Sequence, residues 1–234
     1  FQIQSIVPTV EKALNQSLSY LTKQPMTIKG ASRTDQGVHA KGQVIAFDLE
    51  GNFEIEQFRS AWNRILPPDI RIRSVQPVNS EFHPRFDAIE KTYQYQVACQ
   101  PLDEFNFFRY GEYPQLAGSS LAKFLPYLTV FLGTHDYYAF GITLINQPTI
   151  RTIKSFTVKK TGKGFCFTIT GSGFLRYMVR KLIGTVVQAV IQHTPVENIV
   201  RDLDQHERKA GAKRAPAGGL TLMKIKYPIS KTRV

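Results

Sequence analysis

The sequence predicts an α+β fold rather than a parallel doubly wound sheet. Segments whose apolar residues follow helical spacing alternate with pairs of β-rich segments that are close enough in the chain to form hairpins. The chain has 234 residues, of which 42% are hydrophobic, so it can bury a sizeable core. No run of apolar residues approaches the roughly 18 that a membrane span needs, and a cytoplasmic protein is expected.

In the first 100 residues, two helices and several strands are expected. Apolar side chains recur every three or four positions in two segments, and Pro67 and Pro68 end the second because proline cannot continue a helix. Runs rich in β-branched and aromatic residues predict the strands. The predicted helices span residues 7–21 and 58–65, and the predicted strands span residues 26–28, 43–49, 70–75 and 92–97.

Between residues 101 and 114 the pattern breaks up, and a second half of the chain is expected to begin there. We therefore predict an N-terminal half over residues 1–100 and a C-terminal half over residues 101–234. In the second half the predicted helices span residues 119–132, 174–192 and 195–206, and the predicted strands span residues 152–159, 165–171 and 220–227.

The balance of charge is strongly basic. Thirty Lys and Arg residues against 18 Asp and Glu residues give a formal net charge of +12. A positive field of this size concentrates polyanions near the surface, which makes nucleic acid the leading partner. A solvated basic surface without a nucleic-acid partner explains the same charge. The charge alone therefore does not distinguish the two interpretations, and sequence motifs are needed.

The two cysteines and the histidines do not predict a metal site. Cys99 and Cys166 have no CxxC partner and are expected as small buried hydrophobic residues. His39 has no second histidine at ligand spacing. We expect no metal site from these residues.

The loop from Gly30 to Ala40 concentrates groups that can do chemistry. It places a cation, a carboxylate, two small polar side chains and a histidine between two predicted strands, and loops held by a sheet often carry reactive groups. Asp35 is its only carboxylate. Two readings stay open at this point: a catalytic Asp35, or an aspartate that bonds only to its own turn.

The segment Arg33–Val44 resembles the signature R-T-D-x-G-V-H-A-x-G-Q-V of the bacterial tRNA pseudouridine synthase A family. Eight ordered residues rarely match by chance. Further segments resemble the family in the same order along nearly the whole chain: Leu66–Ile70, Phe82–Phe86, Tyr93–Tyr95, Gly173–Leu175, Met178–Arg180, Gly219–Leu220 and Tyr227–Pro228.

Three features depart from the family pattern. Ser32 stands where the family commonly has Gly, and Tyr177 stands where it has His or Asn. Phe1–Gln4 resembles the end of a family segment that normally follows a first strand, and position 1 is not Met. We therefore expect one strand of the family fold to be missing from the sequence.

The resemblance implies two pseudo-symmetric α+β halves with joined antiparallel sheets, helices on the outer face and a basic central cleft: the pseudouridine synthase fold. It implies isomerisation of uridine to pseudouridine in tRNA, on the 3′ side of the anticodon stem-loop at tRNA positions 38–40. It also implies a homodimer and neither a metal nor an organic cofactor.

The resemblance further implies roles for single residues. Asp35 is the catalytic carboxylate, Arg180 pairs with it, and Tyr93 stacks on the target base. The alternatives are a surface arginine on an amphipathic helix for Arg180 and plain core packing for Tyr93. RNA contacts are expected from Arg33, which helps to flip the nucleotide, from His39 of the signature, from Leu220 on the other side of the pocket, and from the basic residues Arg176, Lys181, Arg208, Lys209, Lys213 and Arg214.

Two other functions fit parts of the sequence. A non-catalytic RNA-binding module agrees with the charge and the aromatic residues, but it gives no reason for a carboxylate beside phosphate. A metal-dependent nuclease would need two or three carboxylates around the metal, and the sequence shows no such cluster.

Overall fold

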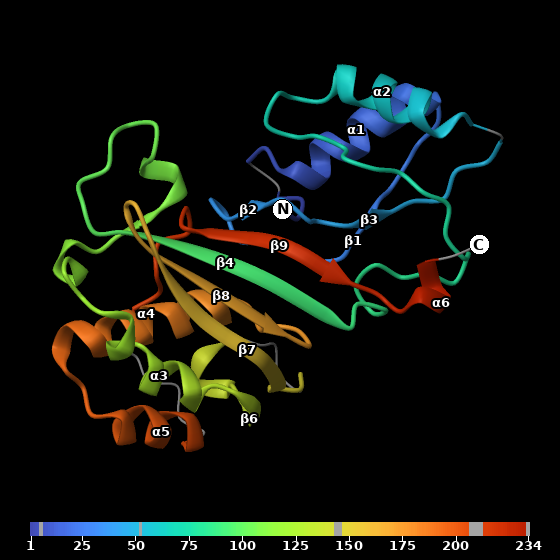
Figure 1. The fold of residues 1–234 in the computed structure, drawn as a ribbon. Coiled ribbons are helices and arrows are strands. Elements are labelled where there is room, and N and C mark those ends of the chain that lie inside the picture. The colour runs from blue at the N-terminus through green and yellow to red at the C-terminus, as the bar shows by residue number, and fades with distance from the viewer. Residues whose placement is uncertain (5–6, 52, 143–146, 206–212, 233–234) are drawn as a thin grey trace. The chain divides into compact units, whose positions relative to one another are not determined.

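A computed structural model describes residues 1–4, 7–51, 53–142, 147–205 and 213–232 (Figure 1). The chain divides into two compact units. The first comprises Phe1–Thr34, Gln43–Ala88 and Lys226–Val234, and the second comprises Asp35–Gly42 and Ile89–Ile225. The expected boundary between residues 100 and 101 falls inside the second unit. The Gly30–Ala40 loop is divided, with Asp35 and the residues after it in the second unit.

The first unit packs two main helices with a small sheet. Thr9 caps the first helix, where its hydroxyl accepts from the backbone N–H of Lys12 at 3.2 Å, and Leu66, before Pro67, ends the second. β1 and β3 pair in antiparallel fashion. The elements are α1 (Val10–Thr22), β1 (Lys29–Gly30), β3 (Ile45–Ala46), α2 (Ile55–Ile65) and α6 (Ile229–Thr232).

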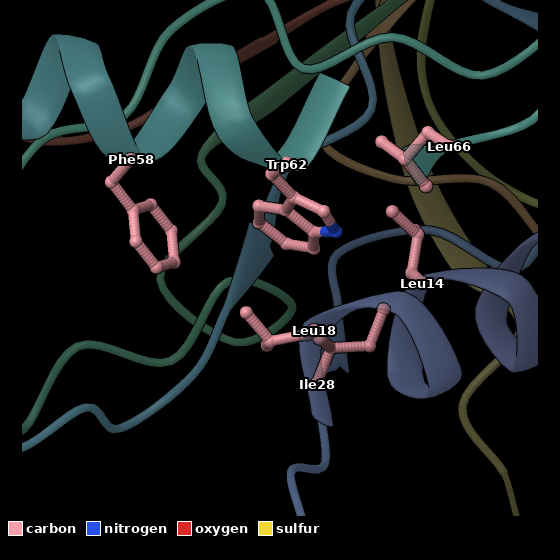
Figure 2. Close-up of a cluster of buried hydrophobic side chains, with 6 residues drawn as sticks. All are labelled: Leu14, Leu18, Ile28, Phe58, Trp62 and Leu66. Atoms are coloured by element: carbon pink, nitrogen blue, oxygen red, sulfur yellow. The ribbon is translucent and has the colours of Figure 1, made fainter. Parts of the chain in front are cut away.

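The core of this unit lies between α1 and α2. Figure 2 shows its six fully or nearly buried side chains: Leu14, Leu18, Ile28, Phe58, Trp62 and Leu66. Trp62 is completely buried, and its indole N–H donates to the hydroxyl of Ser17 at 2.8 Å. The buried indole therefore keeps a hydrogen-bond partner without a water molecule.

The predicted strand over residues 70–75 is wrong. The side chain of Asn63, on α2, bonds both backbone groups of Ile72, accepting from its N–H and donating to its carbonyl oxygen at 2.8 Å each. Arg71 donates to the carbonyl oxygen of Pro67 at 2.6 Å. Side chains thus satisfy the polar backbone groups that a neighbouring strand would otherwise use.

The second unit is built on a seven-stranded sheet. Its order is β2 (His39–Ala40), β9 (Leu220–Lys226), β4 (Glu90–Ala98), β8 (Gly164–Gly171), β7 (Ile150–Thr161) and β6 (Gly133–Asp136), with β5 (Gly111–Glu112) also beside β4. The pairs β4–β8, β8–β7 and β7–β6 are antiparallel. β2–β9 and β4–β5 are parallel, so the sheet is mixed. The predicted α+β fold is confirmed, with antiparallel pairing along β4, β8, β7 and β6 and two parallel pairs in addition.

The helices of the second unit differ from the prediction mainly at their ends. α4 (Met178–Gln192) begins four residues late because Tyr177 adopts a left-handed conformation with φ of 64°. α3 (Leu125–Val130) is shorter than the predicted 119–132. α5 (Val196–Asp204) follows Pro195, and the predicted end at His206 lies outside the described residues. β6 was not predicted, because its Gly-Thr-His-Asp sequence shows no apolar alternation.

The two cysteines lie in or beside the sheet. Cys166, on β8, is buried as predicted, whereas Cys99 is half-buried. Burial raises the pKa of both thiols, and the positive charges of nearby lysines oppose the shift. Both are free, and neither forms a disulfide.

The Ser17 hydroxyl is the first feature to test. We expect Ser17→Ala to lower the free energy of unfolding by about 1–3 kcal/mol, because the buried indole N–H of Trp62 loses its acceptor. Trp62 is the only tryptophan, so its fluorescence during urea unfolding reports on this core directly. Ser60→Ala, at an exposed position on α2, is the control and should leave stability unchanged. Equal stabilities of the two variants would contradict this account.

Candidate active site

The loop that carries Asp35 is fixed to strand β9. The N–H of Val38 donates to the carbonyl oxygen of Asp35 at 3.1 Å, which closes a turn, and Gly37 occupies the left-handed region of the turn with φ of 78°. The loop then enters β2, which pairs in parallel with β9. The N–H groups of Lys41 and Gly42 both donate to the carbonyl oxygen of Leu222, at 2.8 and 3.1 Å.

Asp35 forms an ion pair with Arg180 of α4. The distance from Oδ2 of Asp35 to Nη1 of Arg180 is 3.2 Å, and the side chains are 17% and 13% exposed. At such burial the surrounding dielectric constant is lower than in water, so the attraction between the two charges is stronger than it would be at an exposed surface. The structure therefore brings together the two residues that the family resemblance paired.

A backbone segment next to α4 orients Arg180. Its Nε donates to the carbonyl oxygen of Ala215 at 2.8 Å, and the N–H of Ala215 donates to the carbonyl oxygen of Arg180 at 3.0 Å. Gly184, one turn further along the helix, permits this close approach, because a Cβ there would collide with the carbonyl oxygen of Lys213. The guanidinium is thus held at one nitrogen by the backbone and presents another to Asp35.

Two tyrosines lie within the electrostatic reach of Arg180. Burial is the main cause that raises the pKa of the Tyr95 phenol well above its usual range, and the positive charge of Arg180 opposes the shift. Burial also raises the pKa of Tyr113, again against Arg180. Both phenols therefore stay neutral beside the ion pair, and the Tyr95 hydroxyl donates to the carbonyl oxygen of Pro216 at 3.0 Å.

Sequence reasoning did not assign Tyr95, Tyr113 or Ala215 to this region. The only available signal was for Tyr95, which lies two residues after Tyr93 on β4. Side chains two positions apart point to the same face of a strand. Nothing in the sequence pointed to Ala215, because its contribution comes from backbone groups.

Tyr93 and Leu220 are both buried. Tyr93, on β4, is 7% exposed, and its ring meets that of Phe174 edge to face at a centroid distance of 5.3 Å. Leu220 is a buried residue at the start of β9. Both positions agree with core packing as well as with a wall of a base-binding pocket, and a stacking role for Tyr93 stays a prediction.

The expected RNA-contacting residues fall into different environments. Arg33 is exposed and belongs to the first unit. A ring nitrogen of His39, Nε2, lies 2.6 Å from the carbonyl oxygen of Phe108. The ammonium of Lys181 donates to the carbonyl oxygen of Ala139 at 3.2 Å, so it contributes at least partly to the fold.

Exposed basic groups also border α4. Arg176, Lys213 and Arg214 are exposed. Arg208 and Lys209 lie outside the described residues. Within the described ranges, no three His, Cys, Asp or Glu side chains are grouped to hold a metal ion. Among the same residues, none of the helices combines the length and the apolar character needed to cross a lipid bilayer.

Comparison with known proteins gives the family. A model of the tRNA pseudouridine synthase family matches residues 1–87 and 128–228. tRNA pseudouridine synthase A of Solibacter usitatus is 34% identical over 97% of this chain and 93% of the relative. Those of Brevibacillus brevis and Staphylococcus aureus are 33% and 35% identical, over 97% and 96% of this chain and 93% and 84% of the relatives.

The chain belongs to the tRNA pseudouridine synthase family and is an enzyme of the isomerase class. The resemblance recognised in the signature is thereby confirmed. Asp35, Arg180 and Leu220 lie within the residues that the family model matches, whereas Tyr93 lies in the interval between them.

Gly184 allows a test of how the site is supported. We expect Gly184→Ala to displace the backbone around Lys213 and Ala215, to loosen Arg180 and to lower the turnover of tRNA at least about tenfold, which corresponds to about 1.4 kcal/mol. Gly162→Ala is the control, since a Cβ at Gly162 meets open space. Turnover and thermal unfolding should be measured for both. Unchanged turnover of Gly184→Ala would show that this approach does not support the site.

Proposed function

We propose that this enzyme converts uridine to pseudouridine in the anticodon stem-loop of tRNA, with Asp35 as its catalytic carboxylate. The observation that supports the proposal most directly is the half-buried ion pair between Asp35, in the signature loop of a family member, and Arg180 of α4. We also expect the enzyme to act as a homodimer.

The reaction requires one bond to break and another to form. The bond between N1 of uracil and C1′ of ribose is cleaved, the base turns, and C5 becomes bonded to C1′. The hydrogen on C5 leaves as a proton and N1 gains one, so the mass of the RNA does not change. An ionised carboxylate can add to C6 of the uracil or capture C1′ after the base has left, because it is both a nucleophile and a base. Both routes start from the same carboxylate.

The ion pair leaves one carboxylate oxygen for this chemistry. Arg180 bonds Oδ2 of Asp35, and none of the described residues bonds Oδ1. Arg180 therefore sets the orientation of the carboxylate, while Oδ1 can approach the substrate. The second hydrogen bond of Arg180, to Ala215, resists rotation of the guanidinium.

The substrate reaches this carboxylate only as an extruded nucleotide. C5, C6 and the glycosidic bond cannot all be approached in a stacked stem, so the base has to flip out. We propose that Arg33 assists this step and that Tyr93 contacts the flipped base. The net charge of +12 supplies the attraction for the phosphate backbone.

Release of the C5 hydrogen tests the function. We expect tRNA that carries tritium at C5 of uridine to release tritium to water, with chelator present and without a nucleotide cofactor, and only from a few uridines of the anticodon arm. Asp35→Asn should release none while it binds tRNA within about tenfold of wild type, or about 1.4 kcal/mol.

Several outcomes would contradict the proposal. A nuclease would shorten the RNA and leave tritium on carbon, and a non-catalytic module would bind tRNA without releasing label. Wild-type release by Asp35→Asn would remove Asp35 from the mechanism. RNA length should therefore be measured in the same samples.

Arg180 gives a second test of the mechanism. We expect Arg180→Ala to lose nearly all turnover and Arg180→Lys to keep about a tenth or less, because an ammonium on a flexible stem cannot bond Asp35 and Ala215 in the fixed geometry of a guanidinium. Arg201→Lys, an exposed exchange on α5, should turn over tRNA as wild type does. Full activity of Arg180→Lys would mean that only the charge matters.

A further inference from the structure

Three arginines gather around the ring of Tyr177. The guanidinium carbon of Arg214 lies 4.3 Å from the ring centroid, that of Arg176 lies 4.6 Å away, and that of Arg180 lies 5.9 Å away. These distances are within the range of cation–π attraction. Arg180 is the residue that pairs with Asp35, so the group adjoins the candidate active site.

Hydrogen bonds hold the two chain segments that carry the three arginines. The carbonyl oxygen of Arg176 accepts from the N–H of Ile142 at 3.0 Å, and its guanidinium donates to the Tyr177 hydroxyl at 2.7 Å. Arg214 precedes Ala215, which is bonded twice to Arg180. The three arginines therefore come from two chain segments, residues 176–180 and residue 214, which hydrogen bonds to Ile142 and at Ala215 hold in place.

The backbone of Tyr177 adopts a left-handed conformation, which glycine and asparagine adopt more readily than tyrosine. Its φ of 64° is left-handed, which is uncommon for a bulky side chain. This conformation places the residue at the N-cap of α4 without a capping hydrogen bond from its side chain. The side chain instead contacts the arginines.

Within the described part of the chain, the positive charges of this group exceed the negative charges that pair with them. Asp35 pairs with Arg180, and neither Arg176 nor Arg214 forms an ion pair with a described residue. Like charges at such separations repel one another, so an anion that enters the group relieves the repulsion. Guanidinium groups bind phosphate with two parallel hydrogen bonds, and both Arg176 and Arg214 are exposed.

We propose that Arg176, Arg180 and Arg214 form a binding site for a phosphodiester of the RNA backbone beside the reacting nucleotide, and that Tyr177 is the positioning residue that gathers them. This inference rests on the proposed function for the identity of the RNA. The ring orders two exposed arginines before the RNA arrives, which lowers the conformational entropy lost on binding. Because Arg180 is shared, a phosphate held here fixes the nucleotide relative to Asp35.

The salt dependence of tRNA binding tests the role of Tyr177. Each lost phosphate contact lowers the slope of log K against log salt by about 0.7 to 0.9. We expect Tyr177→Leu to lower this slope by about one, although it removes no charge. Tyr177→Phe should keep most of the slope, because it keeps the aromatic ring and loses only the hydrogen bond from Arg176. Both exchanges retain a side chain of similar backbone preference, so the strain at this φ is comparable.

A multiple-mutant experiment tests whether Tyr177 acts through Arg176 and Arg214 or only supports the fold. Arg176→Ala with Arg214→Ala should lower the slope as Tyr177→Leu does, and combining all three changes should lower it no further, because the same contact is already lost. Tyr20→Leu is the matched control, since the ring centroid of Tyr20, on α1, lies 4.4 Å from the ammonium of Lys23. It should leave the slope unchanged. Additive losses, or a wild-type slope for Tyr177→Leu, would overturn the proposal.

Inorganic phosphate separates this inference from the proposed function. Titrated without RNA and followed by phosphorus NMR, it should bind wild type and Tyr177→Phe at least about tenfold more tightly than Tyr177→Leu. Equal binding by all three would refute the site even if tritium release from tRNA were observed. Selective phosphate binding together with no tritium release would retain the site and reject the proposed reaction.

Discussion

The ion pair between Asp35 and Arg180 is the interaction around which this part of the molecule is arranged. Its partners are 145 positions apart in sequence, and each is largely withdrawn from water. A charge in such a position is costly without its partner, so both have to be held in register. The structure does this with backbone groups: β2 and β9 hold the Asp35 loop, and Ala215 holds the arginine.

Strand β9 and the segment before it connect the elements of this site. The segment contacts α4 through Lys213 and Ala215, and it accepts the hydroxyl of Tyr95 from β4 through Pro216. The chain then enters β9, which carries the Asp35 loop on its other side. One short stretch of backbone therefore links the carboxylate, its cation and the buried Tyr95. A polar interior of this kind is stable because its buried groups are paired.

Much of the secondary structure follows from local sequence. The apolar spacing in α1, α2 and α4 and the alternation along β4, β7 and β8 are strong periodic signals. The errors occur where non-local contacts replace local preference. Residues 70–75 look like a strand, but Asn63 occupies the backbone groups of Ile72. The parallel pairing of β2 with β9 joins segments about 180 residues apart, which no local pattern encodes.

The sequence by itself determined the family, the basic character of the chain and the two charged residues of the ion pair, because a signature loop and a charge count are local properties. Only the tertiary structure brought Arg180 within 3.2 Å of Asp35, buried Tyr93 and Leu220, and placed Arg176, Arg180 and Arg214 around one ring. It also introduced Ala215, whose contribution is a carbonyl oxygen and an N–H that every residue type except proline possesses. The physical reason is that the chemistry of a side chain depends only on the residue type. The distances between side chains and their burial depend on how segments remote in the chain pack together.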